Sequence, residues 1–318
     1  SAVADVSSVG SVMIPMMKKK GYEADYAVGV TIASAIQGVV VPPSHNLVLY
    51  SLAAGGVSIA SLFMAGIVPG FIMLISLMIT GYIIARKRGY QKADPVPRAE
   101  IGGIILHGLL SLSPAVIILG GILTGWFTAT ESGALACLYS FILAFVVYRE
   151  AKITNLWKIL TRTMRTVSMV FFLIAASASF GWILAYLKVP AMVTNLFLSI
   201  SDNPLIILLI INILLLLLGA PMDMAPMILI MTPILLPVVT SFGMDPVHFG
   251  IVLILNAGIG LLTPPVGTVL FVGCAIGKVS IQQGTKAMMP FFYALLVVLL
   301  IITYIPEVVM WLPHLLVK

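Results

Sequence analysis

The sequence predicts an all-α polytopic membrane protein with two repeats in inverted orientation, each holding a re-entrant hairpin and a proline-broken helix. Apolar residues make up 61% of the 318 and charged residues only 9%, and the mean hydropathy is +1.16. A water-soluble protein of this length could not cover its surface with so few polar groups. The second and third observations are an interrupted apolar segment that occurs twice and a charge bias that reverses between its copies.

Several apolar runs are long enough to span or deeply penetrate a hydrocarbon core of about 30 Å. They are 103–123, 128–148, 166–187, 204–219 and 287–305. The basic residues stand in short clusters between these runs, which the positive-inside rule explains without a nucleic-acid partner.

The interrupted segment is centred on Pro42-Pro43 and recurs 222 positions later at Pro264-Pro265. Further upstream, at a spacing of 218, Asp5 corresponds to Asp223. A pair of proline-interrupted apolar segments in corresponding halves indicates the binding site of a transporter. Because two apolar segments precede Asp223 and none precedes Asp5, we expect the natural protein to have further residues before Ser1.

Charges in equivalent loops give the orientation of each element. The loop at Lys18–Lys20 is basic while its counterpart, 241–246, is not; the loop 55–61 is uncharged while its counterpart, 277–286, carries two lysines. Both reversals indicate inverted topology. The predicted path is a hairpin ending near Lys18, a broken helix over 26–56, spans at 63–85, 103–123 and 128–148, a surface helix over 149–165, a span at 166–187, a hairpin over 204–239 with its tip at 219–223, a broken helix over 247–277 and a span at 287–305.

The proline breaks predict cation sites. Proline has no amide hydrogen, so each pair frees two carbonyl oxygens in the preceding turn, and transporters hold sodium at such unwound carbonyls. Asp5 and Asp223 would lie at membrane depth, where an acid is a functional candidate. The predicted residues of the first sodium site are Ser1, Asp5, Gly38, Val41, Pro42 and Ser44; those of the second are Asp223, Gly219, Gly260, Thr263 and Pro264.

Beyond each break a new half-helix begins, and its unpaired amides suit a carboxylate. The predicted substrate-binding residues are Pro43, Ser44, His45, Asn46 and Thr268. Other interpretations stay open: each break could be a packing kink, and either aspartate could cap a hairpin or carry a proton. Glu131 suits a helix N-terminus as well as a substrate contact.

The chain resembles the large membrane (M) subunit of tripartite ATP-independent periplasmic (TRAP) transporters. The resemblance is carried by 1–5, 14–15, 20–22, 42–44, 63–70, 130–134 and 258–265. The runs 18–22, 24–27 and 42–46 are most similar to the sialic acid branch.

This resemblance implies a sodium-driven elevator in the bacterial inner membrane, with no cofactor beyond Na⁺. Its implied partners are a small membrane (Q) subunit and a periplasmic substrate-binding protein (P) that delivers an organic carboxylate. The mobile transport domain would be 1–61 and 166–286, and the scaffold 62–165 and 287–318. A C4-dicarboxylate or other carboxylate permease is the alternative within the family. An intramembrane aspartyl protease using Asp5 and Asp223, and a subunit that does not transport, are the alternatives of other classes.

Overall fold

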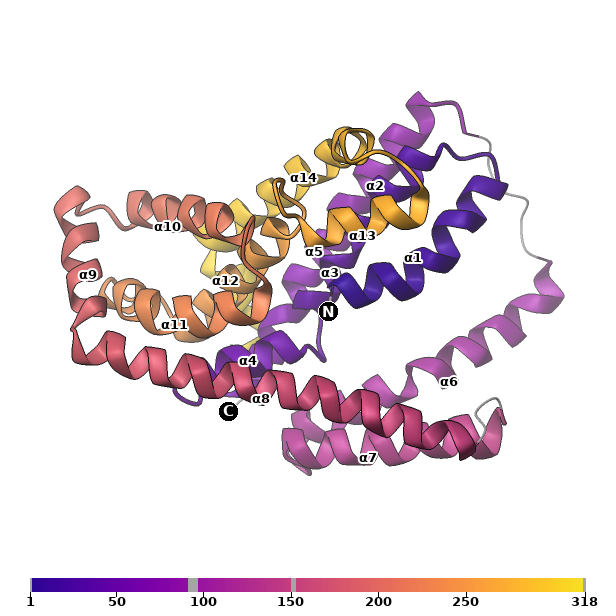
Figure 1. Ribbon diagram of the computed structural model, residues 1–318, viewed down its shortest axis with the longest axis horizontal. Coiled ribbons are helices and arrows are strands. Elements are labelled where there is room, and N and C mark those ends of the chain that lie inside the picture. Colours follow the sequence, from indigo (N-terminus) through magenta and orange to yellow (C-terminus); the bar gives the residue numbers. More distant parts are fainter. Residues whose placement is uncertain (1, 91–96, 150–152, 317–318) are drawn as a thin grey trace. The chain divides into compact units, whose positions relative to one another are not determined.

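The computed structural model describes residues 2–90, 97–149 and 153–316. All regular secondary structure within these residues is helical (Figure 1). Six helices are long and apolar enough to cross a membrane, or seven if a pair bent by 48° at Pro42-Pro43 is one span. The chain is therefore an all-α, multi-pass membrane protein, as the composition predicts.

The helices follow one another without strands among the described residues. They are α1 (Ala2–Lys19), α2 (Ala24–Ala35), α3 (Gln37–Val40), α4 (His45–Ala53), α5 (Ile59–Lys87), α6 (Arg98–Leu123), α7 (Ala129–Ile142), a π-helical turn (Leu143–Val147), a 3₁₀ turn (Ile153–Asn155), α8 (Leu156–Tyr186), α9 (Val189–Ile200), α10 (Pro204–Gly219), α11 (Met224–Ser241), α12 (Pro246–Gly260), α13 (Thr268–Gly277), α14 (Ile281–Tyr304) and α15 (Pro306–Leu316).

The chain divides into two compact units. One comprises residues 1–90 and 176–318, and the other comprises residues 91–175. The smaller unit consists of α6, α7 and the first part of α8, where Glu131 forms a reciprocal capping box with Thr128 at the start of α7. The candidate sites all lie in the larger unit. The predicted division into transport domain and scaffold is a separate question and stays a prediction.

Both broken helices form where the repeat predicts them. In the first, α2 and α3 end at Val40 and α4 begins at His45. In the second, α12 ends at Gly260 and α13 begins at Thr268. The Pro-Pro peptide bond is cis in both. The second hairpin also turns at the predicted tip, since α10 ends at Gly219 and α11 begins after its N-cap, Asp223.

The two broken helices run in opposite directions. Lys18 Nζ donates a hydrogen bond to Gly277 O over 3.3 Å, so the end of α13 lies beside the basic loop that precedes α2. Tyr50 Oη donates to Pro246 O over 2.5 Å, so the end of α4 lies beside the start of α12. Loops that the charge analysis assigns to one membrane surface therefore lie together, as inverted repeats require.

Each hairpin packs on both broken helices. The hairpin arm α1 contacts α2 of its own repeat and α13 of the other, while α11 contacts α12 and α4 in the corresponding way. Figure 1 shows α1 beside α13. At the second crossing, Asn46 Nδ2 approaches Met224 Sδ to 3.8 Å. The four elements around the breaks are consequently interlocked across the repeats.

One predicted boundary differs from the structure, and two stretches for which no element was predicted are helical. A surface helix was expected over 149–165, of which 150–152 lie outside the described residues. From Leu156 the chain continues without a boundary into the expected span 166–187 as one helix, α8, because no proline interrupts it as far as Tyr186. The stretch 188–203 holds a helix, α9, whose first turn contains Pro190. The chain beyond 305 forms α15, with Pro306 at its start.

Candidate functional site

The first break closes around Asp5 of α1. A Cβ placed on Gly38 would stand only 2.5 Å from Asp5 Oδ2, so the carboxylate lies directly against the glycine backbone. Asp5, Gly38 and Val41 line one cavity of about 370 Å³. The structure thus brings together three residues of the predicted first sodium site. Ser1, which was assigned to the same site, lies outside the described residues.

The same cavity is lined by three polar residues that the sequence analysis did not select. They are Thr31, Ser34 and Gln37. Their spacing of three residues, continued by Gly38 and Val41, places them along one face of the broken helix. That periodicity ahead of the proline pair was a signal that could have identified them.

Helix α5 supports the first break from another side. A Cβ on Gly66 would collide with Val40 O, so this glycine allows the carbonyl of the last helical turn to approach the α5 backbone. Gln37 Nε2 donates to Gly70 O over 3.3 Å. The glycines of the 63–70 segment therefore give the unwound chain a close-packed wall.

Ser44 has a structural bond that the proline argument did not foresee. Its hydroxyl donates to Val39 O over 2.6 Å, so it satisfies one of the two carbonyls that the proline pair frees. The side chain is buried, and only its oxygen lone pairs remain to bind a cation. Pro42 is buried beside it, whereas Pro43 and His45 are exposed.

The second break closes around the tip of the α10–α11 hairpin. A Cβ on Gly260 would stand 2.6 Å from Gly219 Cα, so the two backbones touch where only glycine fits. Gly260 O accepts a bond from Thr263 N over 2.8 Å. Asp223 caps α11, with Oδ1 accepting from Met224 N over 2.9 Å. Gly219 and Gly260 thus form the contact between the hairpin and the break, and Asp223 caps the helix that follows the hairpin tip.

Asp223 also faces a larger cavity of about 880 Å³. Its lining comes from the start of α1, the hairpin tip and the first two turns of α13: Val3, Asp223, Pro265, Val266, Thr268, Phe271 and Val272. Thr268 Oγ1 is enclosed and has no hydrogen-bond partner within the described part of the chain. A buried hydroxyl without a partner favours a ligand or water at this position.

The predicted substrate residues separate into two groups. Asn46, which stands at the position equivalent to Thr268, is buried and contacts Met224. Thr268 keeps a free hydroxyl in the large cavity. Pro43, Ser44 and His45 are not among the residues that line this cavity. Val3, Phe271 and Val272, which do line it, are apolar and gave no signal in the sequence.

The two half-helices beyond the breaks share one electrostatic feature. Neither Ser44 before α4 nor Gly267 before α13 provides a side-chain cap to the first amides. The helices α5, α7, α11, α12 and α14 begin with a capping side chain, whereas α2, α6 and α9, like the two half-helices, do not. Uncapped amides at a helix N-terminus retain a positive potential that attracts anions.

The family model for the tripartite ATP-independent periplasmic transporter, DctM component, matches residues 1–308. The chain belongs to this family. It is similar to the sialic acid TRAP transporter large permease protein SiaM of Vibrio cholerae, with 40% identity over 99% of this chain and 74% of that protein. The chain is therefore a transporter permease and not an enzyme, and the protease interpretation of the two aspartates is wrong.

Other relatives of this permease carry different substrates in their names. The C4-dicarboxylate TRAP transporter large permease protein DctM of Pseudomonas aeruginosa is 37% identical over 99% of this chain and 73% of its own. The 2,3-diketo-L-gulonate TRAP transporter large permease protein YiaN of Escherichia coli is 35% identical over 97% and 72%.

Proposed function

We propose that this permease carries out sodium-coupled uptake of an organic carboxylate across the bacterial inner membrane, with sialic acid as the favoured substrate. The observation that carries the proposal is the pairing of each proline break with an aspartate-bearing hairpin. At the first break, Asp5 lies against Gly38. At the second break, Gly219 of the hairpin touches Gly260, and Asp223 stands four residues after Gly219 at the start of α11.

The first cavity has the donor set of a hard-cation site. Its polar lining consists of oxygen-bearing groups: the Asp5 carboxylate, the hydroxyls of Thr31 and Ser34, and the amide of Gln37. Hard cations prefer oxygen ligands, and a charge at membrane depth requires a partner. The carbonyl oxygen of Gly38, which Pro42 leaves without an amide donor, would complete the coordination.

The second cavity suits the substrate. Its volume of about 880 Å³ is within the range of roughly 300–1,000 Å³ typical of small-molecule sites. The uncapped N-terminus of α13 would attract the carboxylate, and Thr268 Oγ1 would bond a polar group. Asp223 also lines this cavity, and its negative charge would repel the substrate carboxylate. A sodium ion bound near Asp223 would remove this repulsion, so that substrate binding would depend on sodium.

Sialic acid is favoured by the sequence runs 18–22, 24–27 and 42–46, and the relative named for it is 40% identical. The substrates in the names of all three compared relatives are carboxylates. A C4-dicarboxylate is the second candidate, since a relative named for it is 37% identical.

The interlocked hairpins support movement of the two breaks as one body. Because α1 packs on α13 and α11 packs on α4, a displacement of one break would carry the other. We therefore retain 1–61 and 166–286 as the mobile domain of an elevator. As members of a tripartite family, such permeases work with a small membrane subunit and a periplasmic binding protein.

The test is uptake of labelled sialic acid into proteoliposomes that contain the full-length permease, its small subunit and the matching binding protein. Uptake should require a sodium gradient and should fail when potassium or choline replaces sodium, and unlabelled succinate should compete poorly. Asp5→Asn and Asp223→Asn should abolish sodium-dependent uptake, while Asp202→Asn, an exposed acid before α10, should not. Uptake that persists unchanged without sodium would overturn the coupling, and better uptake of succinate would overturn the substrate.

A further inference from the structure

Gln37 presents a side-chain oxygen to the first cavity. It is the first residue of α3, directly before Gly38, and it lines the cavity together with Asp5. Its Nε2 donates to Gly70 O of α5 over 3.3 Å, whereas no residue in the described part of the chain donates to its Oε1. A side-chain amide has a donor end and an acceptor end. Because α5 binds the donor end, the acceptor end remains for a ligand in the cavity.

Two glycines of α5 make this contact possible. A Cβ on Gly70 would stand 2.5 Å from Val41 Cγ2, and a Cβ on Gly66 would collide with Val40 O. Any larger residue at these positions would push α5 away from the end of the broken helix. The close approach of the two backbones allows one glutamine side chain to reach both α5 and the cavity.

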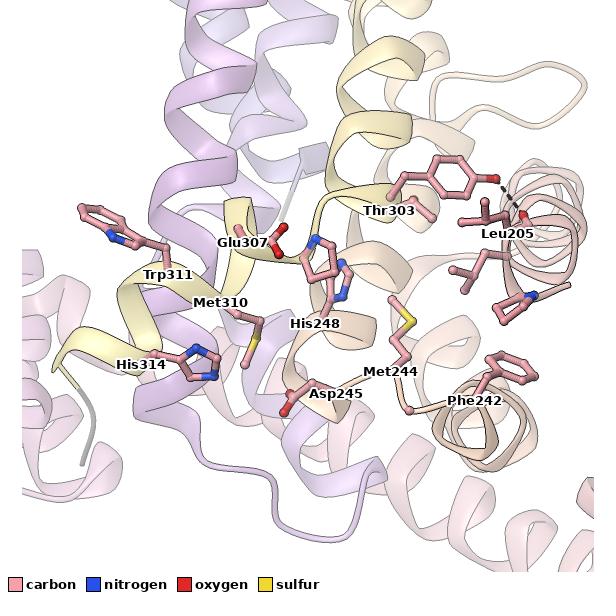
Figure 2. A pocket seen from close by; sticks show the side chains of 15 residues that line it. Leu205, Phe242, Met244, Asp245, His248, Thr303, Glu307, Met310, Trp311 and His314 are labelled. Carbon is pink, nitrogen blue, oxygen red and sulfur yellow. Dashed lines mark hydrogen bonds between the residues drawn. The ribbon is translucent and has the colours of Figure 1, made fainter.

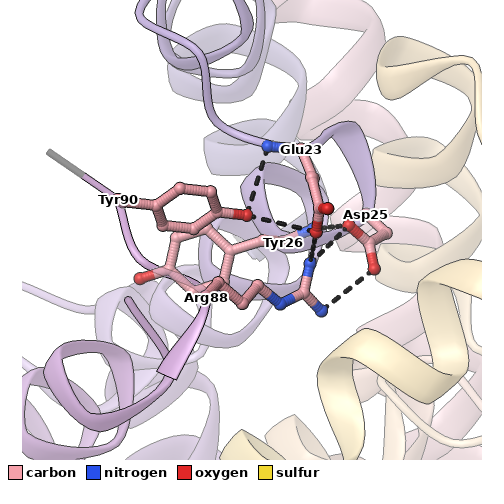
Figure 3. Close-up of polar contacts among 5 residues, drawn as sticks. All are labelled: Glu23, Asp25, Tyr26, Arg88 and Tyr90. Atoms are coloured by element: carbon pink, nitrogen blue, oxygen red, sulfur yellow. Dashed lines mark hydrogen bonds and ion pairs between the residues drawn. The ribbon is translucent and has the colours of Figure 1, made fainter. Parts of the chain in front are cut away.

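Two further connections hold α5 against the first broken helix. Arg88, at the end of α5, bonds to Asp25 at the start of α2 over 2.8 Å (Figure 3). Between this ion pair and the break, Tyr26 Oη donates to Gly81 O over 3.0 Å. The glutamine amide is therefore positioned by the packing of two helices that are joined at three levels, and not by one hydrogen bond alone. Such support from neighbouring elements is what holds a ligand oxygen at a defined distance.

The corresponding position of the second repeat offers no such oxygen. At the spacing of 222, Gln37 corresponds to Ile259 and Gly70 to Phe292. Ile259 is buried and apolar, so it can neither bond to α14 nor bind a cation. The second break therefore shares the aspartate of the first but not its side-chain amide.

The ion pair at the far end of the helix is also missing from the second repeat. Arg88 corresponds to Met310, which lines a cavity of about 600 Å³ (Figure 2). Asp25 corresponds to Val247, so these two positions cannot form an ion pair. Only the middle connection is kept, through His248, whose Nε2 lies 2.7 Å from a carbonyl oxygen of α14. The two breaks are therefore supported differently.

We propose that Gln37 Oε1 is a ligand of the sodium ion in the first cavity and makes this site selective for sodium, whereas the second site lacks this selectivity. The inference rests on the sodium coupling proposed above. Oxygens that packing holds in place favour the ion whose size and ligand number fit them. Lithium is smaller than sodium and is held by fewer ligands. Loss of one ligand therefore weakens lithium binding less than sodium binding.

The test is a calorimetric titration of the full-length permease with its small subunit, in nanodiscs, with sodium chloride or lithium chloride. Choline chloride keeps the ionic strength constant. Gln37→Met keeps the length of the side chain and removes the oxygen. It should weaken sodium binding at one site about tenfold or more, as expected for the loss of a contact to a full charge. Lithium binding should weaken less, so the preference of this site for sodium over lithium should fall, while the other site should be unchanged.

Gln282→Met is the matched control, because it makes the same change at an exposed residue of α14 that lines none of the cavities described above. It should bind both ions normally. Equal weakening of sodium and lithium in Gln37→Met would overturn the role in selectivity, and unchanged binding of both ions would remove Gln37 from the site. Absence of sodium binding to the unmodified permease would instead overturn the sodium coupling on which the inference rests.

Discussion

The contact between Gly38 and Asp5 allows the first sodium site to be weakened in a graded way. A Cβ at Gly38 would stand 2.5 Å from Asp5 Oδ2, whereas Cβ contacts in proteins lie above 3.0 Å and are ordinary from 3.4 Å. In Gly38→Ala the carboxylate must therefore retreat by roughly 0.5–0.9 Å, since it is the movable partner of this contact. The charge of Asp5 is retained while its position changes.

The expected loss follows from Coulomb's law. With an effective dielectric constant of about 20, moving a carboxylate oxygen from about 2.4 to about 3.2 Å from a monovalent cation weakens their attraction by roughly 1.7 kcal/mol. Such a loss corresponds to a somewhat more than tenfold lower affinity. Gly38→Ala should thus raise the sodium concentration for half-maximal uptake by about tenfold, and saturating sodium should restore the rate.

The assay is sodium-dependent uptake in proteoliposomes over a sodium titration at fixed substrate. Gly133→Ala is the matched control, because the added methyl group on α7 meets no atom within 4 Å. Asp5→Asn should be more severe than Gly38→Ala, since it removes the charge. An unchanged sodium titration in Gly38→Ala would refute the assignment of Asp5 to a cation site. A loss that saturating sodium does not restore would point to damage of the fold instead.

Three other predictions concern the second break and its supports. Thr268→Val should raise the substrate concentration for half-maximal uptake about tenfold without lowering the melting temperature, because Oγ1 bonds to no described group; an unchanged value would remove Thr268 from the substrate site. Gly260→Ala should destabilise the protein by about 1–3 kcal/mol in thermal unfolding, because its Cβ would meet the Gly219 backbone at 2.6 Å; stability equal to that of Gly133→Ala would contradict this contact. Asn212→Ala should lower the free energy of unfolding by about 1–3 kcal/mol in thermal unfolding, because the buried Asn212 side chain accepts a hydrogen bond from Asn256 over 2.8 Å and donates one to Thr303 over 3.1 Å. Asn203→Ala removes only an exposed helix cap and should lower it less.

The sequence was informative where backbone chemistry determines the structure. Proline pairs cannot continue a helix, so both breaks lie where Pro42 and Pro264 predict them. The reversed charges of equivalent loops also predicted which helix ends meet, as the bond from Lys18 to Gly277 shows. These features depend on a few residues whose effect is local or set by the membrane.

Features that depend on packing between distant segments were not predictable in the same way. The bond that the Ser44 hydroxyl donates to Val39 O was not predicted, because it depends on how the chain folds at the break; the assignment of Ser44 to ligand sites stays a prediction. Asn46 and Thr268 are equivalent in the repeat, yet Thr268 lines the cavity beside Asp223 while Asn46 lies against Met224. Val3 and Phe271 line the cavity because the fold brings distant segments together. In a sequence that is 61% apolar, nothing distinguishes such residues from those that only pack or face lipid.

The crossing of α1 onto α13 and of α11 onto α4 has a consequence for the origin of this architecture. If the two repeats descend from identical chains inserted in opposite orientations, the same contacts would have joined two subunits about a twofold axis in the membrane plane. Each ancestral chain would have completed its break only with the hairpin of its partner. Fusion into one polypeptide would then have made an obligatory assembly permanent, and it would have freed Asn46 and Thr268 to diverge.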